Sequence, residues 1–169
     1  MMLKFQNLLL FISTTALLSS CGIYSFNGAS IPTDAETIYV KYFNNKAETI
    51  QPSLSQIFTE NLKDIFVKQT NLNLMDSKSD LNFSGYITEY KIQPIAITAN
   101  ETARKNRLTI ATKVTYQNIF DEESSFEQTF SRYRDYESSQ NISDIENELI
   151  EAITSELCED IFNKAFVNW

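Results

Sequence analysis

The residues best placed for covalent chemistry are those that end the first apolar stretch, Leu18–Cys21 with the sequence LSSC. The stretch opens with a single cation, Lys4, and it is too short and too rich in hydroxyl side chains to span a bilayer, which takes about 20 apolar residues. Such a stretch is typical of a secretory signal. Small residues before a cysteine match a bacterial lipobox, so we predict a cleaved signal peptide over residues 1–20 and lipidation of Cys21 by acyl chains such as palmitate. An ordinary signal peptide with a coincidental cysteine is the alternative.

A second group that could bind a ligand is the cation cluster Arg104, Lys105 and Arg107, in a chain whose net charge is −8. Arginine can grip a phosphate with two parallel hydrogen bonds, and lysine adds a point charge. We expect the three cations to project from the end of a sheet, at the turn between two strands, where they could meet a phosphorylated ligand. The alternative is a solubilising loop tip.

The chain offers little for catalysis. It contains no histidine, which removes the commonest general base and the commonest metal ligand. Once Cys21 is acylated, Cys158 has no disulfide partner, and we expect it to be a small buried hydrophobic residue. Carboxylates crowd the last predicted helix, but one open helix face makes no pocket. We therefore predict no enzyme, no cofactor and no metal site; a hydrolase that uses one of these carboxylates is the alternative.

Length and net charge limit the number of domains and the kinds of partner that the protein can have. Cleavage of the signal leaves about 149 residues, enough for one domain with a substantial core. We predict an acylated tether over residues 21–36 and a single domain over residues 37–169. The acidic balance excludes non-specific binding to nucleic acid.

The first third of the domain predicts a strand–helix–strand unit. The β-branched and aromatic run 37–43 is typical of a strand, and Ser53 with Gln56 fits a capping box that opens a helix to Gln69. A short strand over 71–74 follows. We expect the connection through the helix to be a right-handed crossover, the connection that joins parallel strands.

Longer segments between Asp80 and Tyr136 alternate apolar and polar side chains, as the strands of an antiparallel meander do. Their apolar face should pack on the helices. The other face should carry many tyrosine, threonine and serine side chains, including Tyr86 and Tyr90, which suit a surface partly dried by a partner. We therefore predict Tyr86 and Tyr90 at a partner interface; the alternative is that these residues are simply good strand formers.

Ser143 with Glu146 fits a second capping box, and an apolar stripe then runs to Ala165. The elements together predict an α+β fold, a two-layer sandwich in which a mixed sheet of about four strands has two helices packed on one face.

Several stretches in this order resemble the LptE family of lipopolysaccharide-assembly lipoproteins. They are CGIYSFNGASIP at the acylation site, YFNN after the first strand, DLNFSGYITEYKIQP, NRLTI and the terminal DIFNKAFVNW. The resemblance implies a lipid-anchored outer-membrane protein that assists lipopolysaccharide transport as the plug and partner of an LptD-like β-barrel translocon. It also implies a domain of about four strands and two helices, and it transfers no individual ligand residue.

The absence of an acidic run at Gly22 and Ile23 adds the expectation that the protein faces the periplasm. The alternative function is a periplasmic scaffold lipoprotein that binds another envelope assembly factor.

Overall fold

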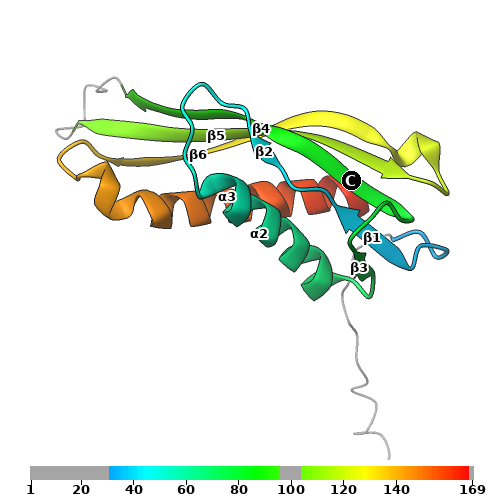
Figure 1. The fold of residues 1–169 in the computed structure, drawn as a ribbon. Coiled ribbons are helices and arrows are strands. Elements are labelled where there is room, and N and C mark those ends of the chain that lie inside the picture. Colours follow the sequence, from blue (N-terminus) through cyan, green and yellow to red (C-terminus); the bar gives the residue numbers. More distant parts are fainter. Residues whose placement is uncertain (1–30, 96–103, 168–169) are drawn as a thin grey trace, which may run out of the picture.

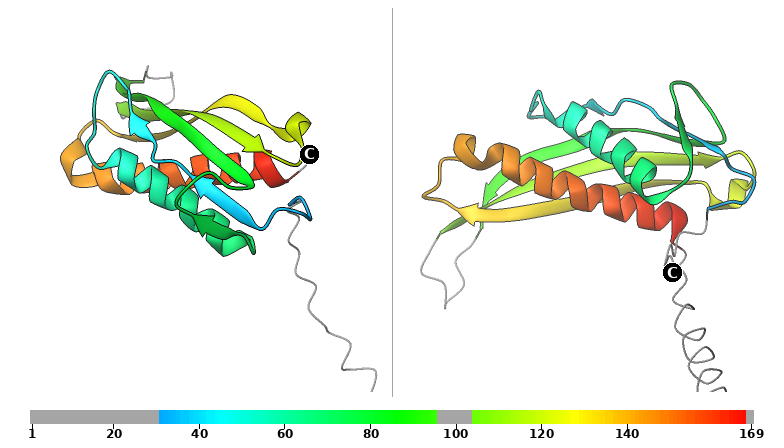
Figure 2. Two further views of the ribbon diagram at one scale, coloured as in Figure 1. Left: turned by 45° about the vertical axis from the view of Figure 1, so that its right-hand side comes forward. Right: turned by 90° about the horizontal axis from the view of Figure 1, so that it is seen from below.

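The computed structural model describes residues 31–95 and 104–167, which form two layers. A mixed sheet makes one layer, and two helices cover one of its faces (Figure 1; Figure 2, right). The α+β class and the two-helix layer are as predicted, but the described part of the sheet has six strands rather than about four. Within these residues, no helix has the length and apolar character needed to cross a membrane.

The strands run in the spatial order β3-β1-β4-β5-β6, and β2 pairs with β4 beside β1. The bounds are β1 (Thr37–Val40), β2 (Asn44–Asn45), β3 (Asn73–Met75), β4 (Leu81–Pro94), β5 (Lys105–Asn118) and β6 (Phe126–Glu137), with helices α2 (Leu54–Gln69) and α3 (Ile142–Phe166) and a 3-10 turn, η2 (Glu122–Ser124). The expected parallel strand–helix–strand unit is present as β1, α2 and β3, and β4, β5 and β6 form the expected antiparallel meander.

The predicted strand over residues 37–43 is divided, which accounts for one of the additional strands. After β1, the backbone N–H of Lys41 still donates to the carbonyl of Phe83 on β4. The next donor in the core, the N–H of Phe43, turns instead to the hydroxyl of Thr59 on α2, at 3.1 Å. The Phe43 side chain is completely buried. Burial of this ring against α2 therefore interrupts the strand. Pairing with β4 resumes at Asn44, the first residue of β2.

Both predicted capping boxes are wrong. At α2, the N-cap Ser53 makes no side-chain cap; the side-chain oxygen of Gln51 accepts from the N–H groups of Ser53 and Leu54 instead. At α3, the cap is Asn141, whose side chain accepts from the N–H of Ser143. In each case a polar residue two positions earlier in the sequence satisfies the free N–H groups of the first turn.

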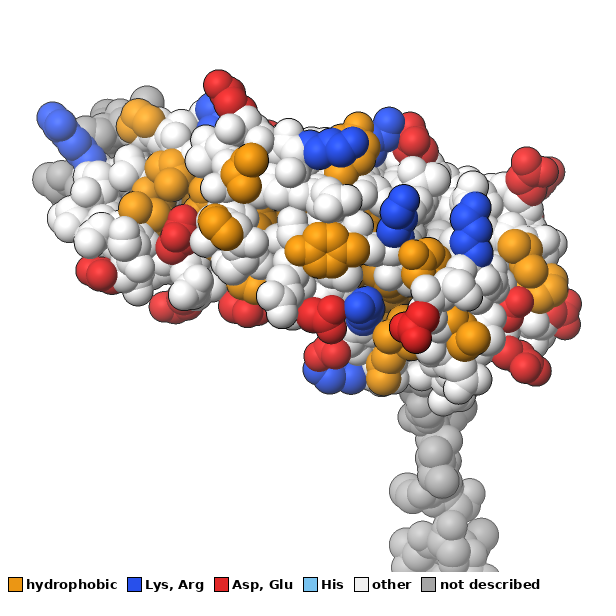
Figure 3. Space-filling view, in the orientation of Figure 1, with side chains coloured by type: hydrophobic (Ala, Val, Ile, Leu, Met, Phe, Trp, Pro, Cys, Tyr) orange, Lys and Arg blue, Asp and Glu red, His pale blue; other side chains and the backbone are white. Residues whose placement is uncertain are grey.

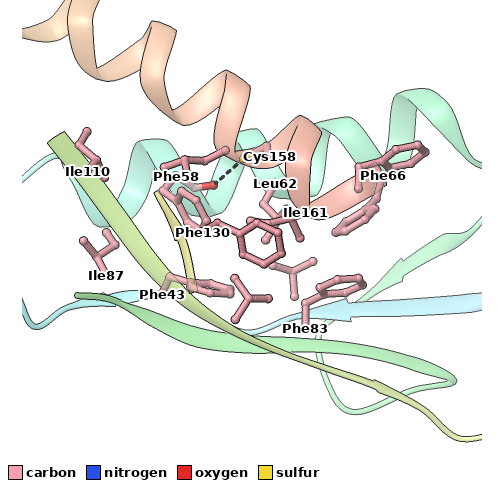
Figure 4. Close-up of a cluster of buried hydrophobic side chains, with 14 of the residues drawn as sticks. Phe43, Phe58, Leu62, Phe66, Phe83, Ile87, Ile110, Phe130, Cys158 and Ile161 are labelled. Carbon is pink, nitrogen blue, oxygen red and sulfur yellow. Dashed lines mark hydrogen bonds between the residues drawn. The ribbon is translucent and has the colours of Figure 1, made fainter. Parts of the chain in front are cut away.

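The core lies between the helices and the sheet and is dominated by phenylalanine (Figure 4). The Phe43 and Phe58 ring centroids lie 5.0 Å apart, and those of Phe66 and Phe83 lie 4.5 Å apart, in tilted geometries that favour aromatic pairs. Cys158 belongs to this core: its side chain is 1% exposed, and burial raises the pKa of its thiol. The sequence-based view of Cys158 as a buried hydrophobic residue is confirmed.

Gly85 is the one position in β4 where a side chain has no room. A Cβ atom there would lie 2.0 Å from the carbonyl oxygen of Lys113 and 2.6 Å from Cε1 of Phe43. Gly85 pairs with Val114 on β5, so the ring of Phe43 packs directly over the backbone at the centre of the sheet. The missing side chain is what allows the interrupted segment after β1 to approach β4.

We expect Gly85→Ala to lower the free energy of unfolding by about 1–3 kcal/mol or more, because overpacking forces backbone and ring apart. Chemical denaturation of the purified domain measures this loss. Thr129→Ala, an exposed position on β6, is the matched control and should change stability by less than about 0.5 kcal/mol. Equal stability of the Gly85 variant and the wild type would contradict the close approach.

Candidate functional site: the open face of the sheet

The open face is the side of β4, β5 and β6 that points away from α2 and α3 (Figure 1). Alternation along β5 assigns its residues: Leu108, Ile110 and Val114 are completely buried on the helix side. Residues 107, 109, 111, 113 and 115, which alternate with these, therefore point to the open side. Residues paired across neighbouring strands point to the same side of a sheet, so the register shows which residues of β4 and β6 also point to the open side. We call this surface the open face.

One row of interacting side chains crosses the open face at Tyr86. The ammonium of Lys46 lies 4.3 Å from the centre of the Tyr86 ring. Lys113, opposite Tyr86 on β5, forms an ion pair of 2.6 Å with Glu127 on β6. The hydrogen bond of this pair, with the attraction of the two charges, raises the pKa of Lys113 and lowers the pKa of Glu127. The row therefore joins a half-buried tyrosine to a closed pair of charges.

A second row lies nearer the start of β5. The guanidinium of Arg107 binds both carboxylate oxygens of Asp135, at 2.7 and 2.9 Å, and lies 3.6 Å from the centre of the Tyr133 ring. The hydrogen bond from Arg107 lowers the pKa of Asp135, because it favours the ionised carboxylate. Tyr133 remains 49% exposed. Arginine, tyrosine and carboxylate thus form one rigid polar and aromatic surface.

The open face carries more charged side chains than the sequence analysis predicted. It does carry tyrosine, threonine and serine, but Arg107, Lys113, Glu127 and Asp135 add charges that neutralise one another. Tyr133, Glu127 and Asp135 were not selected from the sequence as site residues. The signal that could have found them is register: Thr115 faces Glu127 and Arg107 faces Asp135 across the β5–β6 pair.

Tyr90 is not on the open face, contrary to the prediction. A β-bulge between Ile87 and Glu89 adds one residue to β4, so the alternation shifts and Tyr90 points to the helix side opposite Ile110. Its side chain is 5% exposed, and its hydroxyl donates to the carboxylate of Glu146 on α3. Burial and this carboxylate raise the pKa of Tyr90. Glu146, predicted to cap α3, instead binds this tyrosine.

The predicted cation cluster does not project as a unit. Arg104 is exposed and directly precedes β5, and Lys105 is the half-buried first residue of the strand. Arg107 lies inside the strand and is held by Asp135, because its position in β5 directs it across the open face and away from the turn. Lys105 and Asp135 line a shallow groove with Glu148 of α3. Arg104 and Lys105 are thus the members of the cluster nearest the end of the sheet.

Two of the acidic residues that crowd α3 bind arginines of β6. Arg134 of β6 binds Glu156, and Arg132 binds both carboxylate oxygens of Asp160 at 2.6 Å. These pairs fasten the outer strand to the helix. Figure 3 shows acidic side chains along the lower border of the molecule, where the helices lie, and others along its upper edge among hydrophobic and basic side chains.

Two further predicted features concern chemistry. Cys21 lies outside the described residues. Among residues 31–95 and 104–167, no three histidine, cysteine, aspartate or glutamate side chains gather in a way that could hold a metal ion. The open face carries hydrogen-bonding groups, two tyrosine rings and paired charges.

Comparison with known proteins gives one family match. The family model for LptE, described as lipopolysaccharide-assembly, matches residues 35–165. A search of curated proteins found no match.

Two solved structures with a similar fold are a minor lipoprotein from Acinetobacter baumannii and a neuraminyllactose-binding hemagglutinin homolog from Helicobacter pylori. The first has 12% identity and a TM-score of 0.50, covering 76% of this chain and 91% of that protein. The second has 9% identity and a TM-score of 0.51, covering 84% of this chain and 89% of that protein. At such identities the likeness shows a common fold alone.

We expect the two predicted interface tyrosines to respond differently to truncation. Tyr90→Ala should lower the free energy of unfolding by about 3–5 kcal/mol, because it empties a buried site and leaves Glu146 without its donor. Tyr86→Ala should change it by less than about 1 kcal/mol, since its ring lies on the open face. Thermal and denaturant unfolding of the two variants measure the contrast. Equal losses of unfolding free energy in the two variants would show that the bulge does not move Tyr90 to the helix side of the sheet.

Proposed function

The chain belongs to the LptE family of lipopolysaccharide-assembly proteins, and on this premise we propose that it is an outer-membrane lipoprotein that helps a β-barrel translocon assemble lipopolysaccharide. The observation that carries the proposal is the extent of the family match, residues 35–165, which includes every described strand and all but the last residue of α3. The proposed partner is an LptD-like barrel, and the proposed anchor is acylated Cys21, with the domain facing the periplasm.

The open face supports a role as a partner inside a barrel. Two cations of this face, Arg107 and Lys113, are each paired with a carboxylate, and a third, Lys46, lies over the Tyr86 ring. Tyr86 and Tyr133 add ring surface that can be dried without stranding a charge. Pairing offsets part of the cost of drying these charged groups, because each keeps a hydrogen-bond partner within the surface. We propose that this face contacts the barrel wall.

The sheet is long enough to keep the proposed lipid anchor at one end of the domain and a bound lipopolysaccharide at the other. The described chain begins at Ile31, beside β3, while Arg104 stands at the opposite end of β5 (Figure 1). Fourteen residues of β5 span about 46 Å at roughly 3.3 Å per residue. A lipopolysaccharide phosphate bound at Arg104 and Lys105 would therefore lie far from the tether. Screening over about 8–10 Å lets these cations act locally although the chain is acidic.

A pull-down tests the proposed function. Tagged wild-type protein, solubilised from outer membranes in detergent, should bring with it a large β-barrel in equal amount. Cys21→Ser should leave the domain folded but soluble in the periplasm, since the acyl chains supply the membrane affinity. Recovery of a different envelope assembly factor in place of a barrel, at native expression, would favour the scaffold alternative.

The same pull-down tests the open face. The double variant Tyr86→Ala, Tyr133→Ala should recover less barrel, because aromatic side chains dominate interface energies. Its thermal unfolding should match the wild type. The control, Ile50→Ala, truncates a large side chain that is 68% exposed in the segment between β2 and α2, and it should recover the barrel normally. Undiminished recovery by the double variant would place the barrel contact on another surface.

Charge reversal tests the lipopolysaccharide contact. Arg104→Glu with Lys105→Glu should weaken binding of the purified, barrel-free protein to lipopolysaccharide about 5- to 30-fold, if each contact contributes about 0.5–1 kcal/mol. Wild-type affinity should fall with added salt. Lys41→Glu with Lys78→Glu, at two exposed lysines, gives the same change in charge and should leave the affinity nearly unchanged. Equal effects of the two double variants would show that only net charge matters. Arg107 is left intact, because Asp135 already holds it across the open face.

A further inference from the structure

The tip of the β5–β6 hairpin carries two large apolar side chains that no part of the core absorbs. Ile119 is 64% exposed and Phe120 is 48% exposed. Both stand between the end of β5 and the turn η2, at the right-hand end of the molecule in Figure 1. Exposed apolar residues are common singly, but two in succession at a hairpin tip are a candidate contact surface.

The tip is held in a fixed shape. The side-chain oxygen of Asn118 accepts from the N–H of Phe120 at 2.9 Å, and its amide donates to the hydroxyl of Ser124 at 3.0 Å. Across the turn, the N–H of Glu123 donates to Asp121, and the N–H of Ser125 donates to the carbonyl of Glu122. These bonds order the turn before any partner arrives, so little conformational entropy remains to be lost on contact.

The same end of the domain receives the tether. The N–H of Ile119 donates to the carbonyl of Asp80 at 3.1 Å. The carboxylate of Asp80 in turn accepts from the N–H groups of Glu36 and Thr37 at 3.1 and 2.9 Å. One residue therefore links the hairpin tip to the segment where the chain arrives from Cys21.

Covalent geometry then limits how far this end can be from a bilayer. Nine residues, 22–30, separate Cys21 from the described chain, and a fully extended chain spans at most about 3.3–3.6 Å per residue. If Cys21 is acylated, Ile31 stays within about 36 Å of the lipid surface, and the hairpin tip lies at this same end of the domain. The first residue of β5, Lys105, lies at the other end of the sheet and so is farther from the lipid surface than the tip.

We propose that Ile119 and Phe120 contact the lipid surface in which the acyl chains of Cys21 are inserted. The contact fixes the orientation of the domain, with the long axis of the sheet directed away from the bilayer, while the acyl chains supply the affinity. The acidic residues that follow, Asp121, Glu122 and Glu123, restrict the contact to bilayers of low negative charge, because an anionic surface repels them. The proposal rests on the proposed acylation of Cys21.

A tryptophan placed at the tip tests the contact. The probe is the full acylated chain with Phe120→Trp and Trp169→Phe, reconstituted in vesicles of brominated phosphatidylcholine. We expect a blue shift of its emission and a loss of intensity, since bromine quenches only an indole within the bilayer. The matched control is Ile92→Trp in the same background, because Ile92 is 41% exposed at the opposite end of the sheet. It should show neither change.

Vesicles in which phosphatidylglycerol replaces part of the phosphatidylcholine test the charge restriction. Quenching of the Phe120→Trp probe should fall in these vesicles. Glu122→Gln with Glu123→Gln should restore it, whereas Asp144→Asn with Glu148→Gln on α3, an equal change in charge, should not. Quenching that rises with phosphatidylglycerol would overturn the charge restriction.

Two outcomes would overturn the contact, and intact mass distinguishes them. Protein that carries the acyl mass and floats with the vesicles, yet shows equal quenching at positions 120 and 92, has a solvated tip; the proposal then fails while the lipoprotein assignment stands. Protein without the acyl mass removes the premise, and both fail together.

Discussion

The burial of one face of the sheet against α2 and α3 is the constraint on which the other features depend. Phe43, Phe58, Phe66 and Phe83 fill the space between the layers, and each is completely buried. Because successive strand residues alternate between faces, this burial also determines which side chains remain on the open face. Gly85 makes the closest approach possible by leaving room for Phe43 over the strand backbone. The proposed partner surface thus consists of the strand residues whose side chains point away from the core.

One inserted residue changes that assignment along half of β4. Before the bulge, Phe83 and Ile87 face the helices; after it, Tyr90 does. The bulge therefore converts a predicted interface residue into a core residue bound to Glu146. Tyr86, before the bulge, keeps its predicted face, which explains why two tyrosines four positions apart have different surroundings.

The long meander also gives the domain two distinct ends. Asp80 joins the tether entry to the β5–β6 tip at one end, and Arg104 with Lys105 stands at the other. The ion pairs of Arg132 and Arg134 with α3 stiffen the outer strand between them. An elongated domain of this kind can hold a membrane-proximal contact and a distant ligand contact at once.

The sequence by itself determined the α+β class, the two helices, the parallel unit, the meander and the burial of Cys158, because hydrophobic periodicity is a local property. Tertiary structure decided the division of the first strand at Phe43, the bulge before Tyr90 and the pairing of Arg107 with Asp135. Each of these depends on residues far apart in sequence: a hydroxyl on α2, the register of β5, a carboxylate on β6. Periodicity carries no register, so these contacts could not be read from the chain alone.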